Sequence, residues 1–206
     1  SGPSIVLLHG GLNGSSGQAG WRDIAPGLAK AGFRVYAPDL PAFGLTVDET
    51  EYYGYGLGAQ LNFLRDFVDV LCLDTFHLAG NSLGCNIGAH YLVDNPHRVL
   101  SFAGIAGAFG DVVPEDDIQN PAKRGKVNLN FDGTEATMRT ILEGIVLNPE
   151  KISDDLVKMR TLAANNQGER FGKMMGQFFE DVRHTGDANN GVRYRTKGRL
   201  DLLTTP

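Results

Sequence analysis

An apolar, strand-like run that ends in a glycine and serine turn and leads directly into a helical pattern constrains the fold of this chain most strongly. The run spans residues 76–79, the turn at residues 80–84 reads G-N-S-L-G, and a helix is predicted from Leu83 to Asn95. In such a G-x-S-x-G turn the serine hydroxyl is exposed above the sheet, and the glycines permit a strained backbone and close packing of strand and helix. We therefore predict that Ser82 is a nucleophile; an ordinary strand-to-helix turn is the alternative interpretation.

Apolar runs alternate with helical patterns along the first half of the chain. A helix is predicted between the second and third runs, because its apolar side chains recur at spacings of three and four residues and line one face. A long loop rich in glycine and serine, residues 10–20, follows the first run. Strands that alternate with helices predict a parallel sheet with helices on both faces. The expected strands are residues 5–8, 33–37, 76–79 and 99–105, and the helix face is Leu57, Leu61, Leu64, Val68 and Leu71.

The pattern changes after about residue 110, where a polar connector is followed by helical stretches with no strand between them. The second stretch has a plausible N-cap at Ser153, since a serine side chain there can accept a hydrogen bond from the first turn. The apolar residues of the third stretch are expected first to pack on the core. We predict three parts: residues 1–110 as the N-terminal part of an α/β core, 111–195 as an all-helical lid, and 196–206 as a return to the core.

Composition excludes several classes of protein. Hydrophobic residues make up 42% of the chain and charged residues 21%, which is typical of a folded globular protein. The net charge of −5 offers no basic field for nucleic acid, and no apolar run is long enough to span a membrane. Cys72 and Cys85 lack a C-x-x-C spacing, so reduced thiols and a cytoplasmic location are expected. No metal or cofactor motif is found; Asp39 follows a strand but has no companion ligands.

A second motif lies at the end of the first predicted strand, where the chain reads His9-Gly10-Gly11. A flexible loop there can aim backbone N–H groups at an oxyanion, together with the N–H of the residue after the nucleophile. This assigns Gly11, or its neighbour Leu12, and Leu83 as oxyanion donors. A phosphate-binding loop is the alternative, but the segment lacks the G-K-[ST] ending and the G-x-G-x-x-G spacing of such loops.

With these motifs the chain resembles the α/β-hydrolase fold family. The resemblance rests on residues 7–11, 36–44 and 80–84 and covers essentially the whole chain. Within that family it is most similar to the meta-cleavage-product hydrolases, which hydrolyse a C–C bond in 2-hydroxy-6-oxo-dienoates from aromatic ring fission and share the G-N-S-(M/L)-G elbow. Residues 143–160 resemble their second lid helix, whose terminal arginine binds the polar end of the dienoate.

The resemblance also implies site residues and shows departures. It makes Arg160 a substrate-binding residue and Asn81 a polar wall beside the nucleophile. Cys85 stands where these enzymes usually have a second glycine after the elbow. Trp21 is followed by Arg22-Asp23, where the family often has an asparagine that contacts the active site.

A serine nucleophile needs a base and a carboxylate that orients the base. In α/β hydrolases both follow the lid, so we expect them beyond Pro206 and expect the chain to be truncated at both ends. Asp111 is a possible alternate acid position. Among the histidines present, His9 and His77 are expected to be structural, His90 and His97 to lie away from the serine, and only His184 to be able to swing over the site.

The sequence therefore predicts a serine-nucleophile hydrolase of a small-molecule substrate, with a C–C bond of a 2-hydroxy-6-oxo-dienoate as the preferred target. A carboxylesterase that uses the same serine is one alternative. A non-catalytic binding module of the same fold is another. No cofactor, nucleic acid or membrane partner is expected. The sequence allows a homo-oligomer but does not predict the oligomeric state.

Overall fold

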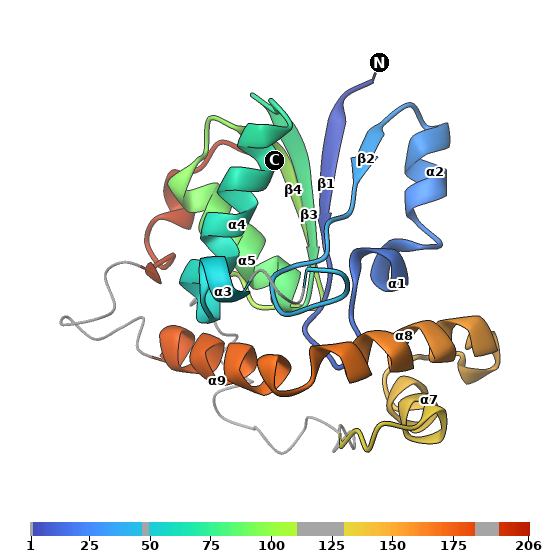
Figure 1. Ribbon diagram of the computed structural model, residues 1–206. Coiled ribbons are helices and arrows are strands. Elements are labelled where there is room, and N and C mark those ends of the chain that lie inside the picture. The colour runs from blue at the N-terminus through green and yellow to red at the C-terminus, as the bar shows by residue number, and fades with distance from the viewer. Residues whose placement is uncertain (1, 47–49, 111–129, 184–193) are drawn as a thin grey trace.

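A computed structural model describes residues 2–46, 50–110, 130–183 and 194–206 (Figure 1). Within these residues the sheet has four strands in the order β2-β1-β3-β4, and every neighbouring pair is parallel. The predicted strands and their parallel pairing are confirmed, although the second strand is shorter and the third longer than predicted. The strands are β1 (Ser4–Leu8), β2 (Arg34–Tyr36), β3 (Phe76–Asn81) and β4 (Val99–Ile105).

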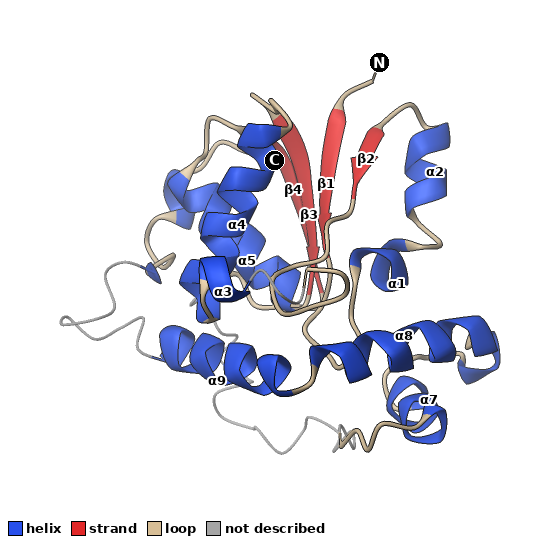
Figure 2. Cartoon of the chain, viewed as in Figure 1, coloured by secondary structure: helices blue, strands red, loops and turns tan. Residues whose placement is uncertain are grey.

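Helices cover both faces of this sheet (Figure 2). The helices α4 (Gly56–Val70) and α5 (Leu83–Asp94) lie on one face, and α1 (Gly17–Trp21) and α2 (Ala25–Lys30) on the other. Successive side chains of a strand point to opposite faces. Accordingly Leu8 belongs to the larger core cluster on the α4 and α5 side, whereas Leu7 packs with Trp21 on the α1 side. The continuous apolar run of β1 is thus explained by burial on both faces.

The predicted face of α4 is largely correct. Leu57, Leu61, Leu64 and Val68 are buried in the main core, and each fully buried side chain of this size contributes about 1.5–3 kcal/mol to stability. Leu71 lies just after the helix and is 37% exposed, so it does not belong to the buried face.

The predicted loop of residues 10–20 is partly wrong, because the short helix α1 begins inside it at Gly17. The Ser16 hydroxyl caps this helix by accepting a hydrogen bond from Ala19 N–H at 3.0 Å. Gly17 itself must be a glycine, since a Cβ there would stand 2.0 Å from the Ala37 carbonyl oxygen. The helix start was therefore not predicted, because the glycine that close packing requires at its first position is more typical of a loop.

Residues 130–183 are helical and contain no strand, as predicted, and α8 and α9 lie across the carboxyl ends of the strands (Figure 1). The predicted Ser153 cap is confirmed, since its hydroxyl accepts from Leu156 N–H at 3.2 Å. The first helix stops earlier than its apolar pattern, because Gly144 caps it. The elements are α7 (Glu135–Glu143), the 3-10 turn η3 (Pro149–Lys151), α8 (Asp154–Gln167) and α9 (Glu169–Arg183).

These helices pack in two different ways. Met138 and Leu142 of α7 form a small separate cluster with Val157 of α8. By contrast, Met174 and Phe178 of α9 are buried in the main core, as the sequence predicts for that stretch. The structure does not test the predicted division into residues 1–110, 111–195 and 196–206, which stays a prediction.

The remaining described elements are short. Thr50–Tyr53 forms α3, and Leu200–Leu202 forms the 3-10 turn η5. The last residue returns to the sheet, where Phe102 N–H of β4 donates to the Pro206 carbonyl oxygen at 2.9 Å. Among the helices of the described part, none is both long enough and apolar enough to cross a membrane.

Candidate active site

Ser82 lies at the junction of β3 and α5 on a sharp, strained turn. Its φ of 51° and ψ of −110° are a conformation that costs a non-glycine residue about 1–3 kcal/mol. The two flanking glycines allow the turn to close. A Cβ on Gly80 would stand 2.2 Å from the Gly84 carbonyl oxygen, and one on Gly84 would stand 2.3 Å from the Leu8 carbonyl oxygen. Ser82 is exposed, so the geometry of the turn presents its side chain to solvent at the carboxyl end of the sheet.

The glycine loop after β1 lies directly against this turn. A Cβ on Gly10 would be 3.6 Å from Ser82 Cβ, and one on Gly11 would be 2.9 Å from the Leu83 side chain. Leu83 is the first residue of α5, and the first N–H groups of a helix have no partner within the helix. The structure thus brings together Ser82, Gly11 and Leu83, the residues predicted as nucleophile and oxyanion donors. Their roles stay predictions.

Asn81 and Arg160 occupy different surroundings. Asn81 lies beside Ser82, and its Nδ2 donates to the Ile105 carbonyl oxygen at 3.2 Å. Arg160 is buried, with Nη2 donating to the Asn13 carbonyl oxygen at 2.7 Å and to Ser15 Oγ at 3.3 Å. Burial lowers the pKa of the guanidinium to about 10, so it is still charged at neutral pH. Arg160 therefore binds the glycine loop, and its predicted role toward substrate stays a prediction.

No hydrogen bond joins Ser82 Oγ to any histidine within the described ranges. His9 is completely buried and both ring nitrogens are engaged, while His77 Nδ1 lies 2.8 Å from Ser101 Oγ. His90 is also buried, with its ring nitrogens 2.8 Å from two carbonyl oxygens, and His97 lies exposed beyond the end of α5. His184 and Asp111, the other candidates for base and acid, lie outside the described residues.

Asp39 has a structural task that sequence reasoning missed. Its Oδ1 accepts from Gly17 N–H at 2.6 Å and its Oδ2 accepts from Leu45 N–H at 2.8 Å, so both carboxylate oxygens tie loops together. In the part of the chain that the structure describes, no group of three or more histidine, cysteine, aspartate or glutamate residues could hold a metal ion.

Two further residues at the site were not predicted from the sequence. A Cβ on Gly107 would be 2.5 Å from the Ser82 carbonyl oxygen, so this glycine lets the loop after β4 support the turn. Gln167 is fully buried against the loop after β1, and its Oε1 accepts from Gly14 N–H at 2.9 Å. The signal for Gln167 was present, since the buried residues Val157, Arg160, Ala164 and Gln167 recur at spacings of three and four along α8.

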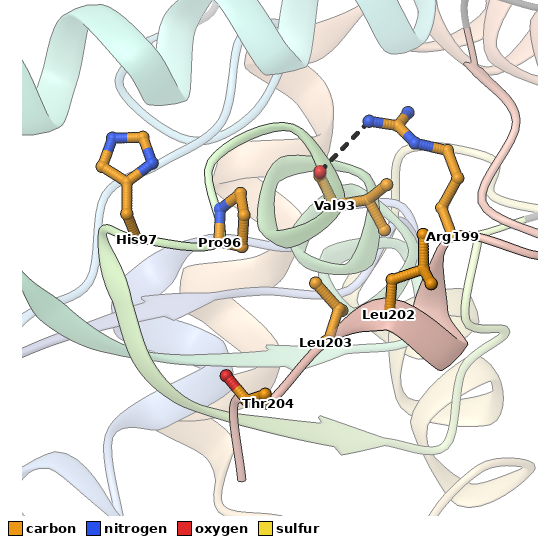
Figure 3. A pocket seen from close by; sticks show the side chains of 7 residues that line it. All are labelled: Val93, Pro96, His97, Arg199, Leu202, Leu203 and Thr204. Atoms are coloured by element: carbon orange, nitrogen blue, oxygen red, sulfur yellow. Dashed lines mark hydrogen bonds between the residues drawn. The ribbon is translucent and has the colours of Figure 1, made fainter.

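A surface cavity of about 450 Å³ lies away from Ser82, between the end of α5 and the C-terminal segment (Figure 3). Arg199 crosses its rim, where Nη2 donates to the Val93 carbonyl oxygen at 3.1 Å. Its lining includes none of the predicted site residues. The lining residues are Val93, Pro96, His97, Arg199, Leu202, Leu203 and Thr204.

Comparison with known proteins assigns the chain to a family. The profile of the α/β-hydrolase fold matches residues 3–183. The chain is 28% identical over 227 residues to a 2-hydroxy-6-oxo-2,4-heptadienoate hydrolase of Pseudomonas putida, an alignment that covers 100% of this chain and 79% of that protein. It is 27% identical over 177 residues to a 2-hydroxy-6-oxononadienedioate/2-hydroxy-6-oxononatrienedioate hydrolase of Paraburkholderia phymatum, and there the alignment covers 84% of this chain but only 60% of the relative.

A solved structure shows the same fold. A variant of the meta-cleavage product hydrolase CumD from Pseudomonas fluorescens aligns with a TM-score of 0.68 at 21% identity, covering 100% of this chain and 70% of that one. The predicted fold and the resemblance to meta-cleavage-product hydrolases are confirmed, and so is the prediction of a hydrolase. This chain belongs to the α/β-hydrolase fold family.

Proposed function

We propose that this hydrolase uses Ser82 to cleave a C–C bond in a 2-hydroxy-6-oxo-dienoate. The observation that carries the proposal is the juxtaposition of an exposed serine at φ 51° with the glycine loop after β1, which contacts the serine turn through Gly10 and Gly11. The substrate class comes from the two relatives named above, both of which are dienoate hydrolases.

In the proposed reaction the dienol first ketonises in the site, with Arg160 holding its oxo and carboxylate end and Asn81 forming a polar wall. Either water or the Ser82 hydroxyl then adds to the distal ketone. The backbone N–H groups of Gly11 and Leu83 stabilise the oxyanion that forms, because donors fixed in advance toward a developing charge need no reorganisation. The C–C bond breaks, its electron pair takes up a proton on the dienoate fragment, and the other fragment leaves as a carboxylic acid, after hydrolysis of the acyl-enzyme if Ser82 attacked.

Arg160 would have to serve two partners in this scheme. Its Nη2 already donates to the loop, whereas its buried Nε has no hydrogen-bond partner among the described residues. A buried donor without an acceptor costs about 1–3 kcal/mol. Because Nε is buried, a substrate carboxylate can reach it only after the Arg160 side chain turns toward the site, and the proposed role of Arg160 includes this movement.

We also propose the organisation predicted from sequence, with residues 111–195 as a lid over a core formed by 1–110 and 196–206, in a cytoplasmic protein. The separate apolar cluster shared by α7 and α8 supports a distinct helical part. The position of α8 and α9 across the carboxyl ends of the strands supports a cover over the site (Figure 1).

The substrate class is tested by two assays on the native protein. Loss of the dienoate chromophore measures C–C hydrolysis, and release of p-nitrophenol from short esters measures esterase activity. We expect kcat/KM for the dienoate to exceed that for the ester. Ester hydrolysis without loss of the chromophore would assign a carboxylesterase instead, and no turnover of either substrate would favour a non-catalytic member of the fold.

A further inference from the structure

One peptide group of the loop after β1 is held at both of its polar atoms by side chains of α8. The Asn13 carbonyl oxygen accepts from Arg160 Nη2 at 2.7 Å, and the N–H of the same peptide, on Gly14, donates to Gln167 Oε1 at 2.9 Å. Gln167 is fully buried and Arg160 is 8% exposed. Residues about 150 positions apart in the chain thus fix one peptide in a water-excluded contact.

The turn that contains this peptide is stiff and lies against the backbone of α8. Ser15 N–H donates to the Leu12 carbonyl oxygen at 3.0 Å, and Leu12 N–H donates to Ser15 Oγ at 3.2 Å. Gly14 has φ 71°, and a Cβ there would stand 2.1 Å from the Arg160 carbonyl oxygen. The turn therefore cannot shift without breaking bonds to α8 or moving the helix.

The same turn continues directly from the predicted oxyanion loop. Gly11 immediately precedes the turn and contacts the Leu83 side chain, while Gly10 approaches Ser82 Cβ. A displacement of about 1 Å at a reacting group can cost a hundredfold in rate. We propose that Gln167 is a positioning residue, which fixes the Asn13–Gly14 peptide and thereby holds the Gly11 N–H at the oxyanion of the Ser82 reaction. This inference rests on the proposed function.

The chemistry of Gln167 favours this role over simple packing. Its Nε2 is buried with no hydrogen-bond partner in the described part of the chain, and such a donor is costly. A methionine would fill similar space without that cost. What the amide has and a methionine lacks is its oxygen, which is the acceptor for Gly14 N–H.

The test compares Gln167→Met and Gln167→Glu with the native protein, and uses Asn165→Ala as the control. Asn165 lies on the same helix but is exposed, and its Nδ2 donates to the Gly133 carbonyl oxygen at 3.1 Å. The readouts are the inhibition constants of an arylboronic acid and of the dienoate product. The boronate adduct of Ser82 places an anionic oxygen at the oxyanion donors, whereas the product does not. Both constants are independent of the fraction of folded enzyme.

We expect Gln167→Met to weaken boronate binding at least about tenfold, to lower kcat in parallel, and to leave product binding within about twofold. Gln167→Glu keeps an acceptor oxygen and should restore most of the boronate affinity, and Asn165→Ala should change neither constant. If the Met variant does not fold, Gln167→Asn, which is shorter by one methylene, is expected to give the same pattern.

Suppose that the native protein turns over the dienoate. Equal losses of boronate and product binding in Gln167→Met, or no loss of either, would then overturn the positioning role of Gln167 and leave the proposed function standing. If the native protein neither turns over substrate nor binds the boronate at Ser82, the proposed function fails and this inference fails with it. The two failures are therefore distinguishable.

Discussion

His9 makes the stability of this protein depend on pH in a way that can be calculated. The ring is completely buried, with Nδ1 donating to the Gly10 carbonyl oxygen at 2.7 Å and Nε2 accepting from Leu40 N–H at 3.0 Å. Its edge packs on Phe43 at a centroid distance of 5.1 Å. The neutral ring therefore satisfies both partners, and a second proton would break the bond to Leu40. Burial lowers the pKa of His9 to about 4, against weaker opposing effects of the hydrogen bond to the Gly10 carbonyl and of the Asp39 charge.

The sign of the effect follows from where the unfolded chain binds its proton. A histidine in the unfolded chain titrates near pH 6.5, so between pH 6.5 and 4 the unfolded state binds a proton that the folded state does not. His9 therefore lowers the free energy of unfolding as pH falls through this window, by about 1.4 kcal/mol per pH unit and about 3 kcal/mol in total. This loss of stability is absent well above pH 6.5, where His9 is neutral in both states. It reaches its full size at about pH 4 and does not grow below that pH.

Urea unfolding followed by circular dichroism at pH 6.5 and pH 5 measures this effect. From His9 alone we expect a loss of about 2 kcal/mol over this interval. His9→Asn should be less stable at both pH values but should lose about 2 kcal/mol less between them. The control His97→Asn removes an exposed histidine and should keep the native difference. An unchanged pH difference in His9→Asn would refute the buried neutral ring.

Two other predictions concern packing around the site. Gly84→Ala should destabilise the protein by more than about 3 kcal/mol in the same urea assay, because its Cβ would stand 2.3 Å from the Leu8 carbonyl oxygen; Gly27→Ala meets no atom within 4 Å and should be neutral or stabilising. Exposed Cys72 should react rapidly with iodoacetamide, whereas Cys85 should stay unmodified until the protein unfolds, because burial both shields the Cys85 thiol and raises its pKa. Equal labelling of the two cysteines in peptide mass spectrometry would contradict the fold around α5.

Local signals in the sequence were sufficient for the sheet and the serine turn. The run before Ser82 and the glycines around it specify strand, turn and helix within about twenty residues, and the Ser153 cap is encoded within one turn of helix. Contacts between distant segments were not predictable in this way. The bond from Gln167 to Gly14 and the contact of Gly17 with the Ala37 carbonyl depend on how the folded elements meet, which no local pattern specifies.

Glycine was informative only where its neighbours were close in sequence. The requirement at Gly80 comes from Gly84, four residues later, and belongs to a recognisable motif. The requirement at Gly107 comes from the Ser82 backbone, and the residues around Gly107 carry no motif of their own. The sequence therefore predicts the serine turn itself, but not that the loop after β4 packs against it.

The most direct test of the central claim, that the reaction depends on the Ser82 hydroxyl, is the rate at which Ser82→Ala removes the dienoate chromophore. Alanine keeps a side chain of nearly the same size at the strained turn, so the fold should be retained while the exposed hydroxyl is lost. Ser101→Ala is the matched control, because Ser101 Oγ lies 2.8 Å from His77 Nδ1 and so tests a serine that has a histidine partner.

We predict that kcat falls at least about a thousandfold in Ser82→Ala and stays within about threefold of the native value in Ser101→Ala. Native-like turnover by Ser82→Ala would contradict the account, and loss of activity in Ser101→Ala alone would move the reaction to the other serine.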